Sequence, residues 1–283
     1  MPRTPQLKLD GMFEYSVKNH FRKQKSFRTT MSRVHRILHS ASPSTPVRKL
    51  GSRGWWINVQ NHILETEQIA NGTINRTLSV CSKAMNFTLD CQLHETKCPK
   101  YPRLPEPESR MFYFSKEGVE KLKFYAVDIY DDQNLAEAIE FSAYTGLRQA
   151  EFLKLKSEDV DWNLGCIWVG GKKRPTKANN VRQVDIHPRL EEMIRNRLSN
   201  DYLFGDDWLN KDHLYRCFKK VRRLAGFNED YVWHCLRHSY GTWLGEVTHP
   251  RQIMALMGHK HIDTTLKYCK ITDKARKKAV LSI

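Results

Sequence analysis

The sequence lacks several features that would place it in a membrane or in an oxidising compartment. It contains no run of about eighteen apolar residues, so no transmembrane helix is expected. Its first residues, MPRTPQLKLDG, hold no apolar signal core, and export by that route is not expected either. The seven cysteines are odd in number and form no C-x-x-C pair, which is typical of reduced thiols. We therefore expect a cytoplasmic protein without disulfides and without a membrane partner.

Metal ligands are nearly as scarce in the sequence. Cys91, His94 and Cys98 form one cluster, but a fourth ligand at a usual zinc spacing is missing and a proline-rich stretch follows. The sequence also shows no internal repeat and no low-complexity tract. We therefore expect a globular protein that works without a metal and without another cofactor.

Basic side chains, in contrast, are in excess. The chain has 47 Lys and Arg against 31 Asp and Glu, a net charge of +16. Residues 1–105 hold 17 basic and 6 acidic side chains, a net of +11, and the remainder holds 30 and 25, a net of +5. Such a surplus attracts a polyanion, and 11% aromatic residues argue against a disordered chain. Composition thus favours a folded nucleic-acid-binding protein over a basic protein without such a partner.

A proline-rich stretch marks the clearest boundary in the chain. ETKCPKYPRLPEPESR, residues 95–110, contains four prolines, which deny the backbone helical hydrogen bonds and hold it extended. A length of 283 residues leaves room for a domain on each side. We predict an N-terminal domain over 1–98, a linker over 99–109 and a C-terminal domain over 110–283.

The N-terminal domain has the pattern of a small helical bundle. In GTINRTLSVCSKAMNFTLD, apolar residues recur every three or four positions from Ile74 to Leu89, with Thr73 as the expected N-cap. Segments 29–40 and 55–67 repeat this pattern. We expect the basic run NHFRKQKSFR, residues 19–28, to precede the bundle as an arm.

DNA phosphates are the expected partners of this basic arm. We assign the contacts to Lys23, Lys25 and Arg28 in the arm and to Arg76 on the polar side of a predicted helix. The alternative is that these residues form an ordinary solvated face, as charge runs often do.

The C-terminal domain mixes helices with a short hairpin. FSKEGVEKLKFYA, with Ser115 as the expected cap, and NLAEAIEFSAYTGLRQAEFLKL have helical patterns. CIWVGG and VRQVDI are short β-rich runs separated by turn material, and helical patterns return from residue 189 onward. The predicted fold class is mainly α with a small antiparallel β-sheet: a helical N-terminal domain and an α+β C-terminal domain.

Three stretches of the C-terminal domain carry chemistry. In HCLRHSYGTWL, a helical wheel gathers His234, Arg237, His238 and Gly241 on one side. With the opposite, apolar side packed, we expect the first side to face a polar and anionic group. Taken alone, a capping histidine beside a surface arginine explains the pattern equally well.

The other two stretches are YTGLRQAEFLKL and MGHKHIDTTLKY. The first puts Arg148 in the first turn or at a break of a helix, with Glu151 three residues on and able to hold it. In the second, we expect Gly258 to end a helix and Asp263 to cap the next. Tyr268 then lies on that second helix, where a tyrosine is ordinarily a packing residue.

Together, TGLRQAE, HCLRHS and GHKHIDTTLKY resemble the signature of the tyrosine recombinases, the phage integrase family of site-specific DNA recombinases. The resemblance is strong over about residues 108–272, and GTINRTLS is more weakly similar to the family's core-binding domain. The resemblance implies that the protein is an enzyme whose tyrosine attacks DNA, leaving a 3′-phosphotyrosyl link and a free 5′-hydroxyl. Such an enzyme then rejoins the strands. One departure is Gly241, where the family usually has alanine.

The resemblance also implies a role for each matched residue. Arg148 and Arg237 would bind the non-bridging phosphate oxygens, His259 would add a donor, His234 would be the general base and Tyr268 the nucleophile. Glu151 matches the family's acidic partner of the first arginine.

The resemblance also implies that a lysine in the hairpin turn is the general acid that protonates the leaving 5′-oxygen. Counting back from the second strand selects Lys177, which we prefer, and counting forward from the first selects Lys172. The turn is longer than the family pattern, so the two counts disagree.

Partners follow from the same resemblance. We expect double-stranded DNA, a homotetramer on DNA through exchange of the C-terminal tail, DNA-bending or directionality proteins, and a nucleoid-associated location in a bacterial host. The apolar tail residues Ala279, Val280, Leu281 and Ile283 are an intersubunit anchor or, equally, part of a frayed charged end. A type IB topoisomerase and a non-catalytic DNA-binding protein on the same fold are the rival functions.

Overall fold

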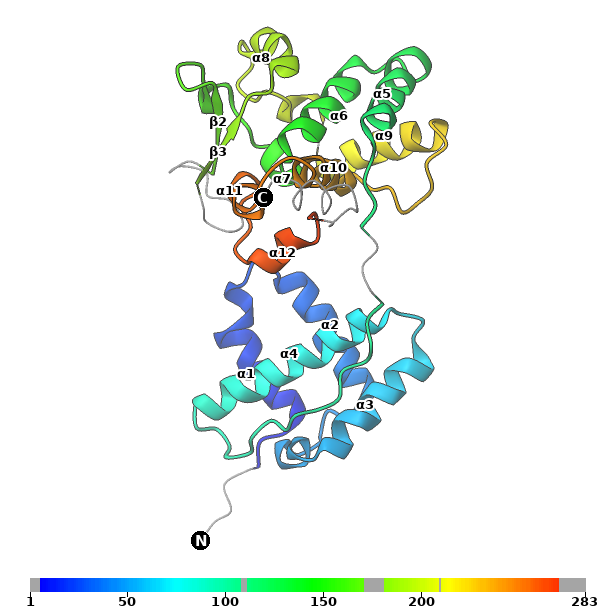
Figure 1. Cartoon of the computed structure of the whole chain (residues 1–283). Coiled ribbons are helices and arrows are strands. Elements are labelled where there is room, and N and C mark those ends of the chain that lie inside the picture. The colour runs from blue at the N-terminus through cyan, green and yellow to red at the C-terminus, as the bar shows by residue number, and fades with distance from the viewer. Residues whose placement is uncertain (1–5, 108–110, 171–180, 209, 270–283) are drawn as a thin grey trace, which may run out of the picture. The chain divides into compact units, whose positions relative to one another are not determined.

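Helices account for most of the described chain, and strands form one small sheet, in the computed structural model (Figure 1). The structure describes residues 6–107, 111–170, 181–208 and 210–269. The chain divides into two compact units, 1–109 and 110–283. In the described ranges, no helix is long and apolar enough to cross a membrane. The predicted fold class, mainly α with a small antiparallel sheet, is confirmed.

Unit 1 is a bundle of helices around one long helix. Its α-helices are α1 (Leu9–Asn19), α2 (Phe27–Ser40), α3 (Arg53–Thr66) and α4 (Asn71–Asp90). α4 contacts the other three, because Ile74, Leu78, Cys81 and Met85 recur at steps of four and three and are fully buried. The amphipathic pattern read from the sequence is therefore the one that builds this core.

Two local expectations for unit 1 are wrong. α4 begins at Asn71, with Ala70 at the N-cap, so Thr73 lies in the first turn and does not cap it. The basic run 19–28 does not precede the bundle, because α1 comes before it and buries Leu9 and other apolar residues in the same core. The run instead joins α1 to α2 through a short 3-10 turn.

The chain that leaves α4 runs back along unit 1 (Figure 1). The Tyr101 ring stacks on Trp56, with ring centroids 4.5 Å apart and planes 6° apart. The Asn75 side chain makes two hydrogen bonds with the backbone of Leu104. Its amide nitrogen donates to the Leu104 carbonyl, and its amide oxygen accepts from the Leu104 N–H, each at 2.9 Å. The described part of the proline-rich stretch thus packs on the N-terminal helices.

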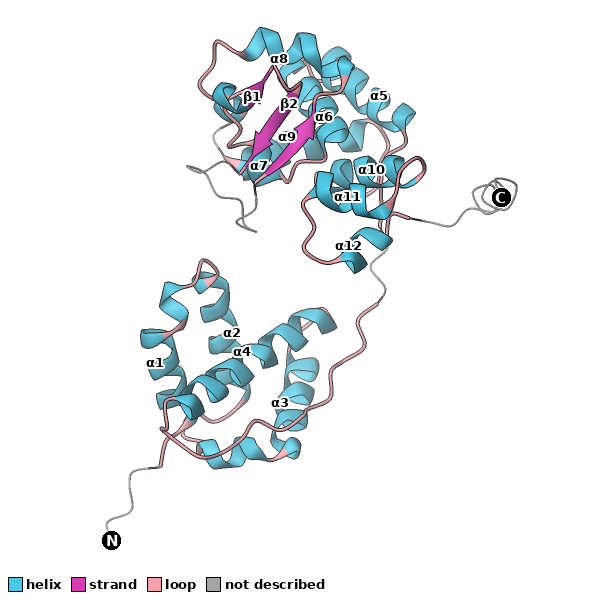
Figure 2. Ribbon diagram, turned by 60° about the vertical axis from the view of Figure 1, so that its left-hand side comes forward, coloured by secondary structure: helices cyan, strands magenta, loops and turns pink. Residues whose placement is uncertain are grey.

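Unit 2 combines helices with a three-stranded antiparallel sheet (Figure 2). The strands are β1 (Val160–Asp161), β2 (Cys166–Val169) and β3 (Arg182–Asp185). The helices are α5 (Lys116–Phe124), a π-helix (Tyr125–Ile129), α6 (Gln133–Thr145), α7 (Gln149–Phe152), α8 (Glu191–Arg197), α9 (Lys211–Leu224), α10 (His234–Gly245), α11 (Pro250–Met257) and α12 (Ile262–Leu266).

The sheet order is β1-β2-β3, and Ile167 pairs with Val184 across the predicted hairpin. This pairing confirms the hairpin between CIWVGG and VRQVDI, whereas β1 was not predicted. Ile167 and Val184 are fully buried in the core that also holds Ile139 and other residues of α6. Ser115 caps α5 as expected, because its hydroxyl oxygen accepts from the Gly118 N–H at 3.0 Å.

Candidate active site

Arg148 is placed by a break between two helices. α6 ends at Gly146, which adopts the left-handed conformation with φ +60°, and a Cβ there would collide with the Tyr240 ring. Leu147 is buried next, and the chain resumes as α7 with Arg148 at its N-cap. The T-G-L-R order therefore turns the chain sharply, and the expected position of Arg148 at a helix break is confirmed.

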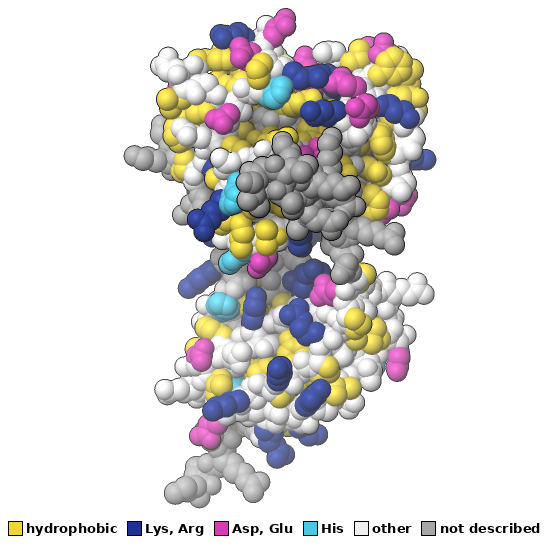
Figure 3. All heavy atoms as spheres, in the orientation of Figure 1, with side chains coloured by type: hydrophobic (Ala, Val, Ile, Leu, Met, Phe, Trp, Pro, Cys, Tyr) yellow, Lys and Arg dark blue, Asp and Glu magenta, His cyan; other side chains and the backbone are white. Residues whose placement is uncertain are grey.

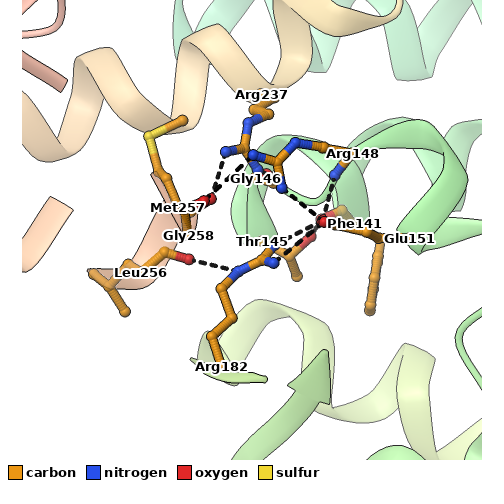
Figure 4. Close-up of polar contacts among 10 residues, drawn as sticks. All are labelled: Phe141, Thr145, Gly146, Arg148, Glu151, Arg182, Arg237, Leu256, Met257 and Gly258. Atoms are coloured by element: carbon orange, nitrogen blue, oxygen red, sulfur yellow. Dashed lines mark hydrogen bonds and ion pairs between the residues drawn. The ribbon is translucent and has the colours of Figure 1, made fainter. Parts of the chain in front are cut away.

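The C-terminal end of α11 receives three arginine side chains (Figure 4). The carbonyl oxygens of residues 256, 257 and 258 accept hydrogen bonds from Arg182, Arg237 and Arg148, respectively. These carbonyls have no partners within the helix and carry its partial negative charge. Gly258 ends the helix at φ +63°, as the sequence predicts, so the helix end orients guanidinium groups from β3, α10 and α7.

Glu151 links two of these arginines. Its carboxylate accepts from Arg148 Nη1 at 2.8 Å and from Arg182 Nη2 at 2.7 Å, and its side chain is only 7% exposed. Burial alone would raise the pKa of this carboxyl, but the hydrogen bonds and charge of Arg182, with those of Arg148, lower it to about 2. Glu151 is therefore ionised at neutral pH and fixes both arginines, as was expected for Arg148.

Arg237 is the most buried arginine of the three, at 2% exposure. It donates to the Gly146 carbonyl at 2.6 Å and to the Met257 carbonyl, and within the described ranges it forms no ion pair with a carboxylate. Burial first, then the charges of Arg148 and Arg182, lower its pKa to about 10. It stays charged at neutral pH, and other elements cover it, whereas His234 on the same side of α10 is exposed.

Tyr268 packs against α10 at Gly241 and Gly245, a contact surface that we call the glycine seat. Its side chain is buried, at 5% exposure, and packs with Met257 in a small apolar cluster. A Cβ on Gly241 would come within 2.7 Å of the Tyr268 ring, and one on Gly245 would collide with the Tyr268 carbonyl. Glycine at both positions thus lets the whole residue approach the backbone of α10, which gives a physical reason for glycine where the family usually has alanine.

Two histidines contact the Tyr268 side chain. His238 Nδ1 lies 2.9 Å from the phenol oxygen in a hydrogen bond, and the His259 ring stacks on the phenol with centroids 5.9 Å apart and planes 11° apart. His259 Nδ1 is itself 2.9 Å from the Thr265 hydroxyl. His234, the expected base, is exposed and contacts His238, with ring centroids 4.7 Å apart.

Burial and nearby cations make these groups unusual acids and bases. The pKa of His238 falls to about 4 through burial first and then the charges of His234 and Arg237, and that of His259 falls to about 4 through burial and Arg237. Burial raises the pKa of Tyr268. At neutral pH the site therefore holds neutral imidazoles and a protonated phenol beside charged guanidinium groups.

α12 begins two residues earlier than predicted. It begins at Ile262, so His261 is at the N-cap position and Asp263 lies in the first turn without capping the helix. Tyr268 follows the end of this five-residue helix, and the short helix together with the α11 end brings the tyrosine to α10.

The structure brings five predicted site residues and their acidic partner together in unit 2. They are Arg148, His234, Arg237, His259, Tyr268 and Glu151. Lys177 and Lys172, and the tail residues Ala279, Val280, Leu281 and Ile283, lie outside the described residues.

The predicted DNA-contacting residues belong to unit 1. Lys23, Lys25 and Arg28 are exposed, and Arg76 is exposed while lying 3.7 Å from Glu106. Figure 3 shows many more Lys and Arg than Asp and Glu side chains on the visible face of this unit. The surface has the charge that the composition predicted.

Sequence reasoning missed two residues of the site, Arg182 and His238. Arg182 shares the inward face of β3 with Val184, and an arginine at an inward position of a strand was an available signal. His238 was already on the same side of the helical wheel as Arg237. Neither signal identifies the partner, because the contacts join residues that are 30 or more positions apart.

The arrangement is suited to a bound anion next to a phenol. Within the described ranges, Glu151 is the carboxylate that pairs with the cluster of Arg148, Arg182 and Arg237, so positive charge remains. Buried charge that is not paired in the protein favours an anionic ligand. A phosphate group could bind the guanidinium donors while Tyr268 lies close by.

Comparison with known proteins identifies relatives over nearly the whole chain. Residues 115–275 match the model described as the phage integrase family. The tyrosine recombinase XerC of Staphylococcus epidermidis is 26% identical over 299 residues, which cover 98% of this chain and 93% of the relative. The tyrosine recombinase XerA of Thermococcus kodakarensis is 30% identical over 227 residues, covering 74% of this chain and 76% of the relative.

Solved structures show the same fold. An integrase of the transposon Tn1549, in complex with transposon right end DNA, superposes with a TM-score of 0.78 at 15% identity and covers 98% of this chain and 99% of that one. A lambda integrase tetramer bound to a Holliday junction gives a TM-score of 0.73 at 16% identity, covering 94% of this chain and 78% of that one.

Proposed function

The chain belongs to the phage integrase family of tyrosine recombinases, enzymes that cleave and rejoin DNA strands, and we propose that it is a site-specific recombinase of a phage or mobile element, active in integration or excision. The observation that carries this proposal is the buried phenol of Tyr268 beside an arginine cluster that retains positive charge. The likeness to the Tn1549 and lambda integrases extends over most of the chain and supports it.

The proposed reaction uses each side chain for one task. Arg148 and Arg237 bind the non-bridging oxygens of the scissile phosphate, with His259 as a further donor, so that they stabilise charge on the pentacovalent phosphorane. Tyr268 attacks phosphorus and the 5′-oxygen leaves with a proton from a general acid. Resemblance assigns this acid to Lys177, with Lys172 as the alternative, and the base toward Tyr268 to His234.

A tyrosine ester explains why strands can be rejoined without ATP. The phenol has an ordinary pKa of about 10, far below that of an alcohol, so a phenolate is a competent leaving group. The bond energy of the cleaved phosphodiester is therefore retained in the 3′-phosphotyrosyl link. Attack by a 5′-hydroxyl from another strand would complete recombination.

We propose double-stranded DNA as the partner of both units. Lys23, Lys25, Arg28 and Arg76 would contact phosphates, and their exposure supports this assignment. By analogy with the lambda integrase tetramer, a homotetramer would assemble on DNA through the C-terminal tail, with DNA-bending or directionality proteins assisting. We propose a cytoplasmic, nucleoid-associated location in a bacterial host, with no membrane and no metal or other cofactor needed for the phosphate chemistry.

Covalent capture tests the proposal. The purified protein is incubated with a pool of nicked duplexes that carry a randomised core, and adducts are recovered on denaturing gels and sequenced. We expect a protease-sensitive adduct with wild type and none with Tyr268→Phe, and we expect the recovered cores to share a sequence. An adduct with the Phe variant would refute the proposal, and recovery of unrelated sequences with relaxation of supercoiled plasmid would indicate a type IB topoisomerase instead.

A further inference from the structure

We infer that His238, rather than His234, accepts the proton of the Tyr268 hydroxyl when the tyrosine attacks phosphorus. The inference rests on the proposed role of Tyr268 as nucleophile. His238 Nδ1 is 2.9 Å from the phenol oxygen, within the reach that a general base requires. In the tautomer with its proton on Nε2, this nitrogen accepts the hydrogen bond of the hydroxyl whose proton has to leave.

The surrounding packing holds the phenol in the direction of His238. Gly241, one turn further along α10 than Arg237, permits the tyrosine ring to lie against the helix. The stacked ring of His259 covers the phenol, and the burial of Tyr268 restricts it further. A fixed geometry of this kind matters because proton transfer and attack must occur at the same oxygen.

The charges around His238 keep its acceptor nitrogen free of a second proton. His234 and Arg237 act on it from α10, His259 from the loop that follows α11, and Lys267 from the end of α12, beside Tyr268 itself. Burial and these neighbours lower the pKa of His238 to about 4, so the imidazole is neutral at pH 7. The tautomer with its proton on Nε2 leaves Nδ1 to accept from the phenol. A phosphate bound among the arginines would bring a negative charge that favours the imidazolium form.

The step balances without another reagent. The Oη–H bond of Tyr268 breaks and its proton moves to His238 Nδ1, while an Oη–P bond forms and the bond from phosphorus to the 5′-oxygen breaks. That oxygen leaves as a hydroxyl with the proton of the general acid. In the rejoining step, the imidazolium of His238 returns its proton to the phenol oxygen as it departs.

Matched histidine variants test the inference. His238→Asn and His234→Asn are compared with wild type for the single-turnover rate of adduct formation on the duplex recovered by covalent capture. Asn retains a hydrogen-bonding group but cannot take up a proton. We expect His238→Asn to be slower by about 10²- to 10⁴-fold at pH 7. Thermal unfolding and retention of the duplex on a filter confirm that each variant is folded.

The pH profile separates a proton acceptor from a residue that only supports the fold. Wild type should be nearly independent of pH between about pH 6 and pH 8, whereas the rate of His238→Asn should rise about tenfold per pH unit, because tyrosinate must then form in advance. A duplex with sulfur at the bridging 5′ position needs no leaving-group acid, so it should not restore His238→Asn.

Several outcomes would overturn the inference. They are a wild-type rate in His238→Asn, an equal loss at all pH values, restoration by the sulfur substrate, or the pH-dependent defect in His234→Asn instead. These results leave the proposed function intact if wild type forms the Tyr268 adduct. Absence of any wild-type adduct refutes the proposed function and the inference together.

Discussion

Replacement of Glu151 by glutamine should destabilise unit 2 by removing the carboxylate between two arginines. Arg182 is only 7% exposed on its side chain and pairs with Glu151 at 2.7 Å, and Arg148 pairs with the same carboxylate at 2.8 Å. Glu151→Gln keeps the size of the side chain but leaves both guanidinium groups without a compensating charge. Loss of one partner of a buried pair is costly because the other charge stays desolvated.

The magnitude follows from the lowered pKa of Glu151. A decrease from 4.5 to about 2 corresponds to roughly 3 kcal/mol of stability at neutral pH. Because the folded pKa is depressed, this contribution is complete above pH 4.5 and is lost as pH falls toward about 2. We therefore expect Glu151→Gln to lower the free energy of unfolding by about 3 kcal/mol at pH 7, and the difference from wild type to shrink on acidification below pH 4.5.

Urea unfolding followed by tryptophan fluorescence measures this difference. Asp201→Asn is a matched control, because Asp201 also pairs with a cation, Lys156, but its side chain is 68% exposed and solvent screens the pair. The control should unfold at nearly the wild-type urea concentration. Equal losses in the two variants, or a Glu151→Gln difference that is as large at pH 2 as at pH 7, would refute the reasoning.

Three further predictions concern other contacts. Gly241→Ala should cost about 1–3 kcal/mol in urea unfolding and slow Tyr268 adduct formation, because the added methyl overpacks the place where Tyr268 lies against α10. Gly118→Ala should do neither, because its Cβ would come no closer than 3.4 Å to the Phe227 ring, and equal behaviour of the two variants would contradict this. Tyr101→Ala should lose about 1–2 kcal/mol with the stacking on α3 and expose residues 94–107 to limited proteolysis, and unchanged cleavage would count against it. DNA affinity should fall with salt, and Lys25→Ala should reduce the log–log slope by about 1, whereas an unchanged slope would remove Lys25 from the contact surface.

The helices were predictable where their signal is local. Apolar residues that are fully buried in α4, such as Ile74, Leu78, Cys81 and Met85, recur with helical period, and that period is visible in the sequence without knowledge of the partner helices. Helix starts were less predictable. Asn71 begins α4 while its amide donates to the Pro105 carbonyl, 34 positions away, and no local pattern contains that contact.

The site shows the same division between local and long-range information. The motifs placed Arg148 at a helix break and Gly258 at a helix end, because a left-handed glycine and a capping arrangement are encoded within a few residues. The contacts of Arg182 and His238 depend on α11, α12 and the glycine seat in three dimensions. Sequence reasoning therefore identified most of the chemical groups but not the hydrogen bond between His238 and Tyr268.

One backbone carbonyl at the end of α11 binds each of the three guanidinium groups, and a single carboxylate, Glu151, pairs with two of them. This arrangement affects what the site can bind. A carbonyl at a helix end carries only a partial charge, so it directs Arg237 and Arg148 without cancelling their charge. A second carboxylate in the same position would hold them equally well but would neutralise the cluster and compete with a phosphate. The single Glu151 fixes the geometry and leaves a positive surplus, which is the electrostatic condition for stabilising a doubly charged phosphorane more strongly than the singly charged phosphodiester.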